Sequence, residues 1–564
     1  MKNKIYLYHI IYIIFISASF SQNIHLNITG KDSISTTYIK TTDYTKIFQN
    51  IKTLQEEVSR IKSNTQRLGY FNSTISPVKK VNDSSYYSEL KLNTHFKNIV
   101  VSYNHSELNK KELIEILDSS TLITPNTFTC KTKNLESNLN KIINHFSNKG
   151  QVFSNFRLTN IRTNKNTVHA DLDLTTSKTN YISEIKIKGY ERFPKKFIKH
   201  YLQLKKNQQL NLEDIEKKSN NLNYLKFASE KKKPEILFTK DSSVAYIYIG
   251  KKKTNSFEGF LGFSSNPETN KLDINGNIDL KLINNLNSGE ELYIKYKSTE
   301  NEQRHIHFKT IIPYIFNTPF TIEGQFDIFK KDSSFTNNTQ ALLLKYNLNK
   351  NISTGLGIRL NNSNNLEENN TENNSDFKKR SYLINFSHHS PNKKNSIFKT
   401  KTQTELEVSL SNRESKNTTI NQQNISLTSE YLFQINKTNT FFTKSKSNYL
   451  ISDNVYDNEQ LYIGGINSIR GYQENSIPST QYSVLNTEYR IELSKNLYTH
   501  TVFDYGITKN NTSKDNINLI GFGLGFGLKS NNSLLRFIIA NRKNRNENIT
   551  FSESKIHLSL STLF

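Results

Sequence analysis

Few side chains in this sequence are spaced in a way that could support covalent or metal chemistry. The 564-residue chain contains no His-Glu-x-x-His zinc motif, no Gly-x-Ser-x-Gly nucleophile turn and no phosphate-binding loop. His305 and His307 would lie on one face of a strand, but a metal site needs a third ligand, and the sequence shows none nearby. We therefore predict that the protein is not an enzyme and has no catalytic residue, metal or cofactor.

The most distinctive motif lies in residues 461–472, within a long stretch otherwise rich in Asn, Ser and Lys. It combines a glycine pair with a tetrapeptide, namely Gly464 and Gly465, then Ile469, Arg470, Gly471 and Tyr472. An arginine suits a latch, because its planar guanidinium can donate two charge-assisted hydrogen bonds to one carboxylate. A glycine beside it permits a tight backbone turn. The alternative is that Arg470 is an ordinary loop charge.

The elements around this motif are predicted to be strands. From about residue 254 to the end of the chain, apolar and polar residues alternate with the period of a β-strand. A soluble sandwich would bury the apolar face, whereas a transmembrane barrel turns it to lipid and keeps charges such as Lys281 and Lys297 in a wet lumen. Closure of a barrel also leaves no edge N–H in hydrocarbon. The export signal, the richness of the chain in Tyr and Phe, and alternating segments of about ten residues favour the barrel.

We expect sixteen antiparallel strands in residues 254–564, an even number as in bacterial barrels. They are predicted to begin near residues 256, 271, 289, 304, 320, 339, 352, 379, 402, 420, 438, 481, 497, 516, 532 and 551. The glycine-rich run 523–527 alternates in the same way, which indicates a strand and not a nucleotide-binding loop. The polar stretches 361–376 and 454–479 are too long for turns and are predicted to be extracellular loops.

The N-terminal part is predicted to hold an export signal and three small domains. Residues 1–21 combine a basic start, an apolar run and small residues before a cut after Ser21, which is typical of a secretory signal peptide; a membrane anchor is the alternative. Periodicity then predicts modules with the order β-α-α-β-β. Their predicted bounds are 22–97, 98–180 and 181–253.

Composition excludes several classes of protein. Outside residues 1–21, no run approaches the roughly 18 apolar residues of a spanning helix, and the mean hydropathy is −0.64. The single cysteine, Cys130, excludes an internal disulfide scaffold. A formal net charge of +25 would suit nucleic acid. The export signal argues against that partner, so we predict no nucleic acid and a surface that is solvated or faces anionic lipid.

The predicted modules resemble POTRA domains. Together with the alternating strands and the Ile469-Arg470-Gly471-Tyr472 motif, they make the chain resemble the Omp85 superfamily, whose barrel is of the bacterial surface-antigen type. The resemblance implies α+β periplasmic POTRA domains followed by an all-β, 16-stranded antiparallel transmembrane barrel. It also implies the outer membrane of a Gram-negative-type bacterium, with the POTRA domains in the periplasm.

The resemblance further implies site residues. In the family, the arginine of this tetrapeptide docks on an acidic residue of an inward-facing strand, and Asp504 occupies the matching position. Further barrel positions that match the family are Gly464, Gly465, Glu488, Arg490, Phe503 and Gly506. The last strand resembles the C-terminal signal by which such barrels are recognised for assembly, with Leu558, Leu560 and Phe564.

The function implied by the resemblance is assembly of outer-membrane proteins. POTRA domains would receive unfolded outer-membrane or secreted clients from periplasmic chaperones, with accessory lipoproteins or an inner-membrane partner. The client would then enter the lipid bilayer through or beside the seam between the first strand, near 257–263, and the last strand, 551–564. The alternatives are a two-partner-type polypeptide secretion pore and, in another class, a passive porin.

Overall fold

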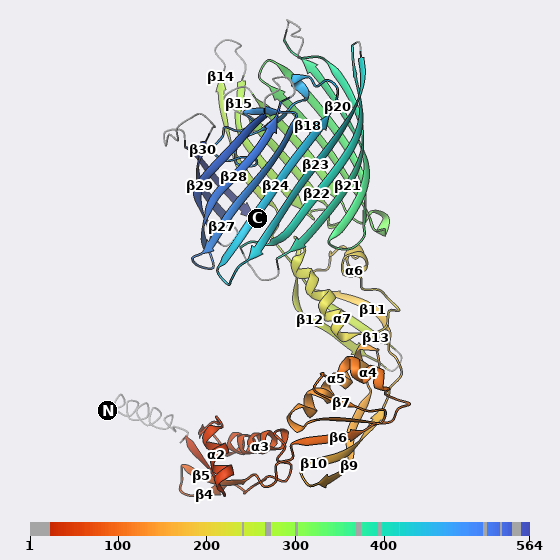
Figure 1. Cartoon of the computed structure of the whole chain (residues 1–564), viewed down its shortest axis with the longest axis vertical. Helices are drawn as coiled ribbons and strands as arrows, with labels where there is room; N and C mark the ends of the chain where they lie inside the picture. Colours follow the sequence, from red (N-terminus) through yellow and green to blue (C-terminus); the bar gives the residue numbers. More distant parts are fainter. Residues whose placement is uncertain are drawn as a thin grey trace, which may run out of the picture. The chain divides into compact units, whose positions relative to one another are not determined.

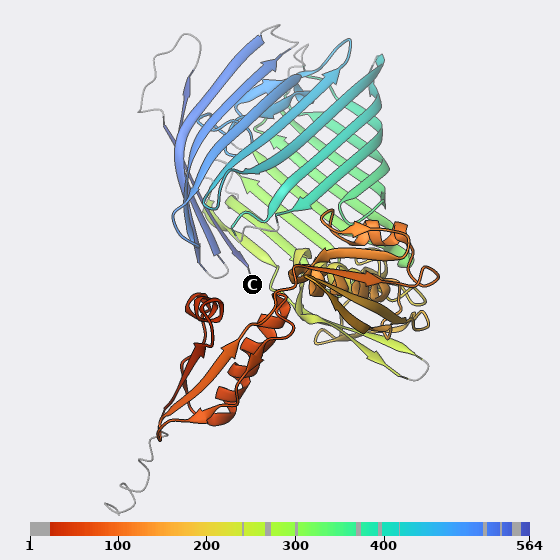
Figure 2. The ribbon, with the colours of Figure 1, turned by 60° about the horizontal axis from the view of Figure 1, so that its bottom comes forward.

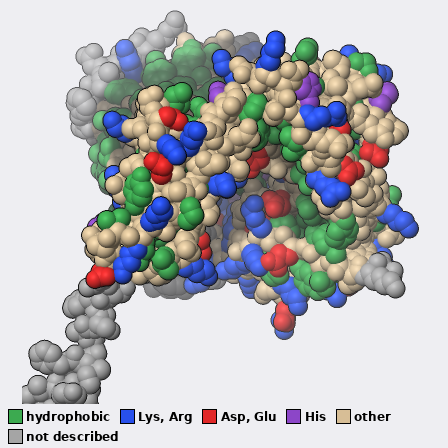
Figure 3. Space-filling view, turned by 90° about the horizontal axis from the view of Figure 1, so that it is seen from below, with side chains coloured by type: hydrophobic (Ala, Val, Ile, Leu, Met, Phe, Trp, Pro, Cys, Tyr) green, Lys and Arg blue, Asp and Glu red, His purple; other side chains and the backbone are tan. Residues whose placement is uncertain are grey.

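The computed structural model describes residues 23–239, 242–265, 272–298, 303–367, 374–392, 397–416, 418–510, 516–530, 533–543 and 554–563 (Figure 1). The predicted signal peptide and the final residue, Phe564, lie outside these ranges. Small mixed sheets with helices extend to Lys251, and a closed antiparallel barrel begins at Ser256. Lysine and arginine side chains are interspersed with acidic ones over the face of the molecule seen in Figure 3.

The first sheet has the strand order β2-β1-β5-β3, with β4 also paired to β5. Helix α3 buries Leu54, Val58 and Ile61, which are spaced to lie on one helical face against this sheet's apolar cluster. The bounds of its elements are β1 (Ile24–Gly30), α2 (Ser33–Thr41), β2 (Ile47–Phe48), α3 (Ile51–Arg67), β3 (Thr74–Ile75), β4 (Lys79–Lys80) and β5 (Ser85–Lys91).

The second sheet has the order β7-β8-β6-β10-β9. Both it and the first sheet differ from the predicted β-α-α-β-β order, because β2 separates the helices of the first module and two strands separate those of the second. The first of these, β7, is two residues long and therefore too short to show an alternating pattern. The bounds are β6 (Asn98–Ser102), α4 (Lys110–Ile116), β7 (Leu122–Ile123), β8 (Thr127–Lys131), α5 (Leu135–Asn148), β9 (Asn155–Asn164) and β10 (Thr167–Thr175).

The third sheet follows the predicted order, with strands arranged β11-β13-β12. Strands β11 and β13 are parallel, and β12 pairs antiparallel with β13, so β11 and β12 form the two edges. None of the helices in the described ranges is both long and apolar enough to span a bilayer. The bounds are β11 (Ile182–Lys188), α6 (Lys196–His200), α7 (Leu212–Asn220), β12 (Ala228–Phe238) and β13 (Ser243–Lys251).

Sixteen antiparallel strands close into the barrel, which confirms the predicted fold class (Figures 1 and 2). Each strand begins within about four residues of its predicted start. The strands are β14 (Ser256–Ser265), β15 (Leu272–Ile283), β16 (Glu291–Ser298), β17 (Arg304–Ile312), β18 (Phe320–Lys331), β19 (Phe335–Asn347), β20 (Ile352–Asn365), β21 (Phe377–Pro391), β22 (Thr400–Ser415), β23 (Thr418–Gln434), β24 (Asn439–Ile451), β27 (Gln481–Glu492), β28 (Leu497–Lys509), β29 (Asn516–Ser530), β30 (Ser533–Lys543) and β31 (Lys555–Leu563).

The alternation in sequence becomes an outer and an inner face of the barrel. On β19, Leu342 and Leu344 are 62% and 47% exposed on the outside, whereas the intervening Leu343 is 2% exposed. The charge of Lys345 is turned inward, where its Nζ donates to Glu323 Oε2 at 2.7 Å. Lys297 likewise faces the lumen, 3.3 Å from Glu474. The apolar face therefore meets lipid and the charged face meets the lumen.

The seam between the first and last strands is the weakest junction of the wall. Within the described ranges, β14 pairs with β31 only through Ser256 with Leu563 and Phe257 with Thr562. On its other side, β14 pairs with β15 over the whole length of the strand, Ser256–Ser265. Beyond these two pairs, no ladder pairing joins β14 and β31 in the part of the chain that the structure describes, which leaves strand edge along the junction. The seam is thus the place where the wall opens at least cost in backbone hydrogen bonds.

Turns at one end of the barrel contact the third sheet's module. Lys196 Nζ donates to the carbonyl of Pro313 at 2.6 Å, and Phe197 packs edge-on against Tyr314 with ring centroids 5.0 Å apart. Asn284 Nδ2 donates to the hydroxyl of Tyr190 at 2.7 Å. Because hairpin turns alternate between the two ends, the turns after β15, β17, β19 and β21 all lie at this module end.

Candidate functional site

The loop between β24 and β27 carries the distinctive tetrapeptide and enters the barrel lumen. It contains the short helix η4 (Asp457–Glu459) and a hairpin of β25 (Leu461–Ile463) and β26 (Ile477–Ser479). Ile469 and Tyr472 are buried in an apolar cluster with Val484 and Leu519 of the barrel wall. Gly464 and Gly465 both have positive φ, +119° and +89°, where the hairpin turns. The hairpin tip is therefore packed on the wall from within.

Arg470 is bound by two carboxylates on adjacent strands. Its Nε and Nη2 donate to the two oxygens of Asp504 on β28, at 2.8 and 2.6 Å, and its backbone N–H donates to the same carboxylate at 2.8 Å. Its Nη1 donates to Glu488 Oε1 on β27 at 2.5 Å. Arg470 is 4% exposed and Asp504 is fully buried. This is the bidentate geometry that gives the strongest arginine–carboxylate pairs.

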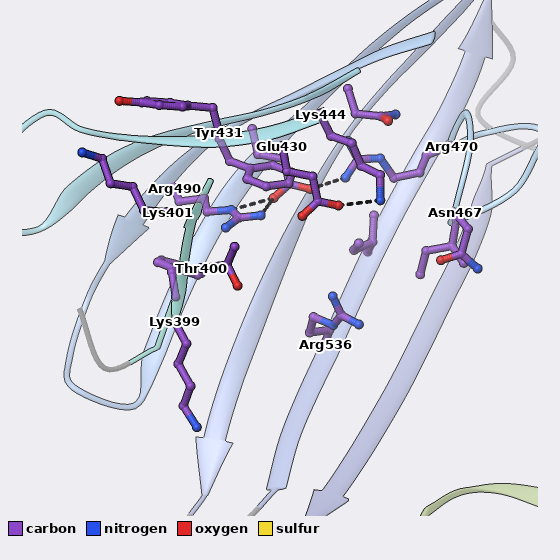
Figure 4. Close-up of a pocket in the computed structure, with 16 residues that line it drawn as sticks. Lys399, Thr400, Lys401, Glu430, Tyr431, Lys444, Asn467, Arg470, Arg490 and Arg536 are labelled. Atoms are coloured by element: carbon purple, nitrogen blue, oxygen red, sulfur yellow. Dashed lines mark hydrogen bonds and ion pairs between the residues drawn. The ribbon is translucent and has the colours of Figure 1, made fainter. Parts of the chain in front are cut away.

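A second arginine completes this network. Arg490, on the same strand as Glu488, donates from Nε to Glu488 Oε2 at 2.7 Å (Figure 4). Its guanidinium carbon lies over the ring of Phe442 at 4.0 Å and over the ring of Phe398 at 4.5 Å. The network then holds two arginines against two carboxylates, so its charges balance within a buried site.

Two glycines allow the tip to approach the wall closely. Gly471 has φ +89°, and a Cβ there would lie 2.4 Å from the carbonyl oxygen of Asn541 on β30. On β29, a Cβ at Gly521 would lie 2.2 Å from the carbonyl oxygen of Arg470. Any side chain at either position would push the tip away from the wall, because the contacted atoms belong to the backbone.

The remaining predicted site residues have different environments. Gly506 faces the site, where a Cβ would lie 3.3 Å from Ile469 Cδ1. Phe503 is 51% exposed on the outer face and therefore points away from the network. Leu558 and Leu560 are also exposed on the outer face of the last strand. Phe564 lies outside the described residues.

Sequence reasoning missed a second anchor of the same loop. Arg413, on β22, donates to Glu459 of η4, and its guanidinium carbon lies 4.0 Å from the ring centroid of Tyr456. Both charged side chains are buried. Gln422 Nε2 on β23 donates to the same glutamate at 3.0 Å. Arg413 has the inward parity of Ser409 and Ser411 on its strand, so the alternating pattern could have identified it as a lumenal charge in need of a partner.

The histidine pair gains a neighbour that the sequence did not suggest. Asp327, across the ladder on β18, lies 2.5 Å from His305 Nε2 and 2.5 Å from His307 Nδ1. The register places Asp327 opposite His307, and His305 lies two residues away on the same face of β17. Within the described ranges, no group of three or more such side chains is arranged to hold a metal ion. These two hydrogen bonds join β17 to β18.

Comparison with known proteins agrees with this architecture. Residues 284–564 match the model of the Omp85 superfamily domain, and residues 180–250 match the POTRA model, described as the surface antigen variable number repeat. No curated protein matches the sequence.

Two solved structures share the fold. BamA from Haemophilus ducreyi lacking POTRA domains 1–3 is similar with a TM-score of 0.54 and 14% identity, over 84% of this chain and 100% of that one. CdiB from Escherichia coli is similar with a TM-score of 0.50 and 14% identity, over 91% of this chain and 98% of that one. The chain therefore belongs to the Omp85 superfamily, with a POTRA domain preceding a sixteen-stranded β-barrel, an architecture that implies an outer membrane.

Proposed function

We propose that the protein inserts β-barrel clients into the outer membrane through the seam between β14 and β31. The observation that carries this proposal is the two-pair register of that seam, beside junctions that are paired along whole strands. An unpaired strand edge binds an extended client strand by backbone hydrogen bonds, whatever the client's sequence. The lumen offers a less direct route, because the loop that carries Arg470 and Glu459 is anchored to the wall inside it.

The N-terminal sheets provide the receiving surface in this proposal. The third sheet has β12 at one edge and β11 at the other, and β12 runs over Ala228–Phe238. An unfolded outer-membrane or secreted polypeptide can add to such an edge as a further strand. Periplasmic chaperones would deliver the client, and accessory lipoproteins or an inner-membrane partner would bind the same domains. We further propose that residues 22–97 and 98–180 are POTRA domains like the third.

A disulfide across the seam tests the proposal. Phe257→Cys and Thr562→Cys, which are register partners, would be combined with Cys130→Ala so that no other thiol remains. The purified protein would be reconstituted in liposomes and challenged with an unfolded β-barrel client. We expect oxidation to abolish insertion of the client and reduction to restore it, because the client needs a free strand edge.

The matched control is a disulfide at a fully paired junction. Leu344→Cys and Leu356→Cys are register partners on the outer faces of β19 and β20, in the same Cys130→Ala background. Oxidation there should leave insertion unchanged. Insertion at the full rate through an oxidised seam would contradict the proposal. Passage of a soluble polypeptide through the oxidised protein would indicate secretion, and a large steady ion conductance without either activity would indicate a porin.

A further inference from the structure

A cavity of about 330 Å³ lies in the barrel lumen beside the network of Arg470, Arg490, Glu488 and Asp504 (Figure 4). The hairpin tip contributes Asn467 and Arg470 to its lining, and β27 contributes Glu488 and Arg490. The segment Phe398–Lys401, at the module end of β22, also lines it. The cavity therefore lies between the tip of the inward-folded loop and the end of the barrel that carries the module contacts.

The charges that line this cavity do not cancel. Arg470 and Arg490 are balanced by Glu488 and by Asp504 behind the lining. A further pair is formed by Lys444 and Glu430, with Nζ and Oε1 2.8 Å apart. Three more cations line the same cavity and form no ion pair with any residue in the described ranges, namely Lys399, Lys401 and Arg536.

These three cations come from two separate parts of the barrel, the start of β22 and the strand β30. Lys399 lies in the turn before β22, Lys401 lies on β22 and Arg536 lies on β30. All three side chains are exposed to solvent. Like charges held in a hollow with low-dielectric walls focus a positive potential and raise the local concentration of anions. Because the cations are spread over the lining, they suit several separated negative groups better than a single small anion.

The other walls suit a polypeptide. The Arg490 guanidinium lies over the rings of both Phe398 and Phe442, and Phe398 also packs edge-on against Tyr498 with centroids 4.9 Å apart. These contacts place aromatic rings and a guanidinium in the same lining as the three cations that form no ion pair within the described ranges. Such surfaces bind both apolar side chains and carboxylates.

We infer that this cavity binds a carboxylate-bearing, extended segment of polypeptide that enters the lumen from the module end. The inference rests on the proposed function, because it names the chemistry of a segment that such a client would present. Lys399, Lys401 and Arg536 bind the carboxylates, and the aromatic wall receives the intervening side chains. A bound segment lies directly against Arg470 and Glu488, which line the cavity. It therefore contacts the same ion-pair network that holds the loop tip on the wall.

The test measures binding of a fluorescent ten-residue peptide with alternating Glu and Leu to the full-length protein in nanodiscs of neutral phospholipid. A peptide with Gln in place of every Glu is the ligand control. We expect the acidic peptide to bind, and binding to weaken as NaCl rises from about 0.05 to about 0.5 M, because screening shortens the Debye length. Equal affinity for the Gln peptide would overturn the inference.

The variant for this test is Lys399→Gln with Lys401→Gln and Arg536→Gln. It should bind the acidic peptide roughly tenfold or more weakly, because it removes the uncompensated charge. The matched control removes three exposed lysines at the barrel rims, Lys378→Gln, Lys437→Gln and Lys495→Gln, and should bind like the unaltered protein. If the two triple variants bind equally well, the cavity is not the binding site. Lys399→Gln with Lys401→Gln serves the same purpose if the triple variant fails to fold.

Two further measurements separate the possible failures. If inorganic phosphate displaces the peptide at the concentration at which free glutamate does, the site is one for small anions and the peptide assignment is wrong. Client insertion in liposomes is measured on the same protein preparations. Peptide binding without insertion would overturn only the proposed function, whereas insertion without peptide binding would overturn only the cavity inference.

Discussion

Among the contacts of the loop between β24 and β27 with the barrel wall, two are buried arginine–carboxylate pairs, and they place the arginine on opposite partners. At the tip, the loop supplies the arginine, Arg470, and the wall supplies the carboxylates of Asp504 and Glu488. At the other anchor, the wall supplies Arg413 and the loop supplies Glu459. Inside a barrel, either partner of a buried ion pair can come from the loop, provided that the geometry satisfies both charges.

The two anchors also differ in how completely their groups are paired. The guanidinium of Arg470 donates from Nε, Nη1 and Nη2. In the second anchor, Nε and Nη2 of Arg413 find no hydrogen-bond partner in the part of the chain that the structure describes, and the ring of Tyr456 covers the guanidinium instead. We therefore expect the tip anchor to contribute more to stability, because an unsatisfied buried donor carries a desolvation cost.

The largest effect is expected at the tip. Arg470→Ala would leave Asp504 and Glu488 buried, with only Arg490 to compensate them, and removal of one partner of such a network costs about 3–5 kcal/mol. The folded barrel should therefore lose its heat-resistant gel mobility at a lower temperature. Arg470→Lys keeps the charge but cannot donate two parallel hydrogen bonds to one carboxylate. Its heat resistance should therefore lie between that of Arg470→Ala and that of the unaltered protein. Unchanged heat resistance in Arg470→Ala would refute the latch.

A smaller loss is expected at the second anchor. Arg413→Met keeps a similar volume but leaves the buried Glu459 with Lys379, whose Nζ lies 3.9 Å away, as its cation, at a cost of about 3 kcal/mol. Adding Glu459→Gln removes the stranded charge, so the double variant should recover most of the heat resistance. If Arg413→Met is more damaging than Arg470→Ala, the ranking of the two anchors is wrong.

The smallest effect is expected where the tip meets the opposite wall. Lys297 and Glu474 form an ion pair at 3.3 Å, but their side chains are 31% and 28% exposed. Solvent screens such a pair, so Lys297→Gln should cost only about 0.2–1 kcal/mol. The same gel assay should show a shift barely above its error. A shift as large as that of Arg470→Ala would mean that the wall pair, and not the buried network, holds the tip.

The barrel was predictable because its signal is local. Alternation along a single strand assigns each residue to the lipid or the lumen without reference to any other strand, and closure adds only an even strand number. Lys281 and Lys297 were assigned to the lumen in this way, and Leu524 and Phe526 alternate outward in the glycine-rich strand. In the second sheet, β7 was not predicted, because a strand of two residues is too short to show alternation of apolar and polar side chains.

By itself the sequence determined which barrel residues face lipid, where each barrel strand begins to within about four residues, and which loop carries the distinctive arginine. Only the tertiary structure decided what these charges meet. Arg413 and Glu459 are 46 positions apart and come together because the loop runs back across the lumen. Asp327 reaches both histidines because the ladder register places it opposite His307, and His305 lies two residues away on the same face of β17. Alternation is a property of one strand, whereas a loop path and a register depend on contacts between strands, so no single segment encodes them.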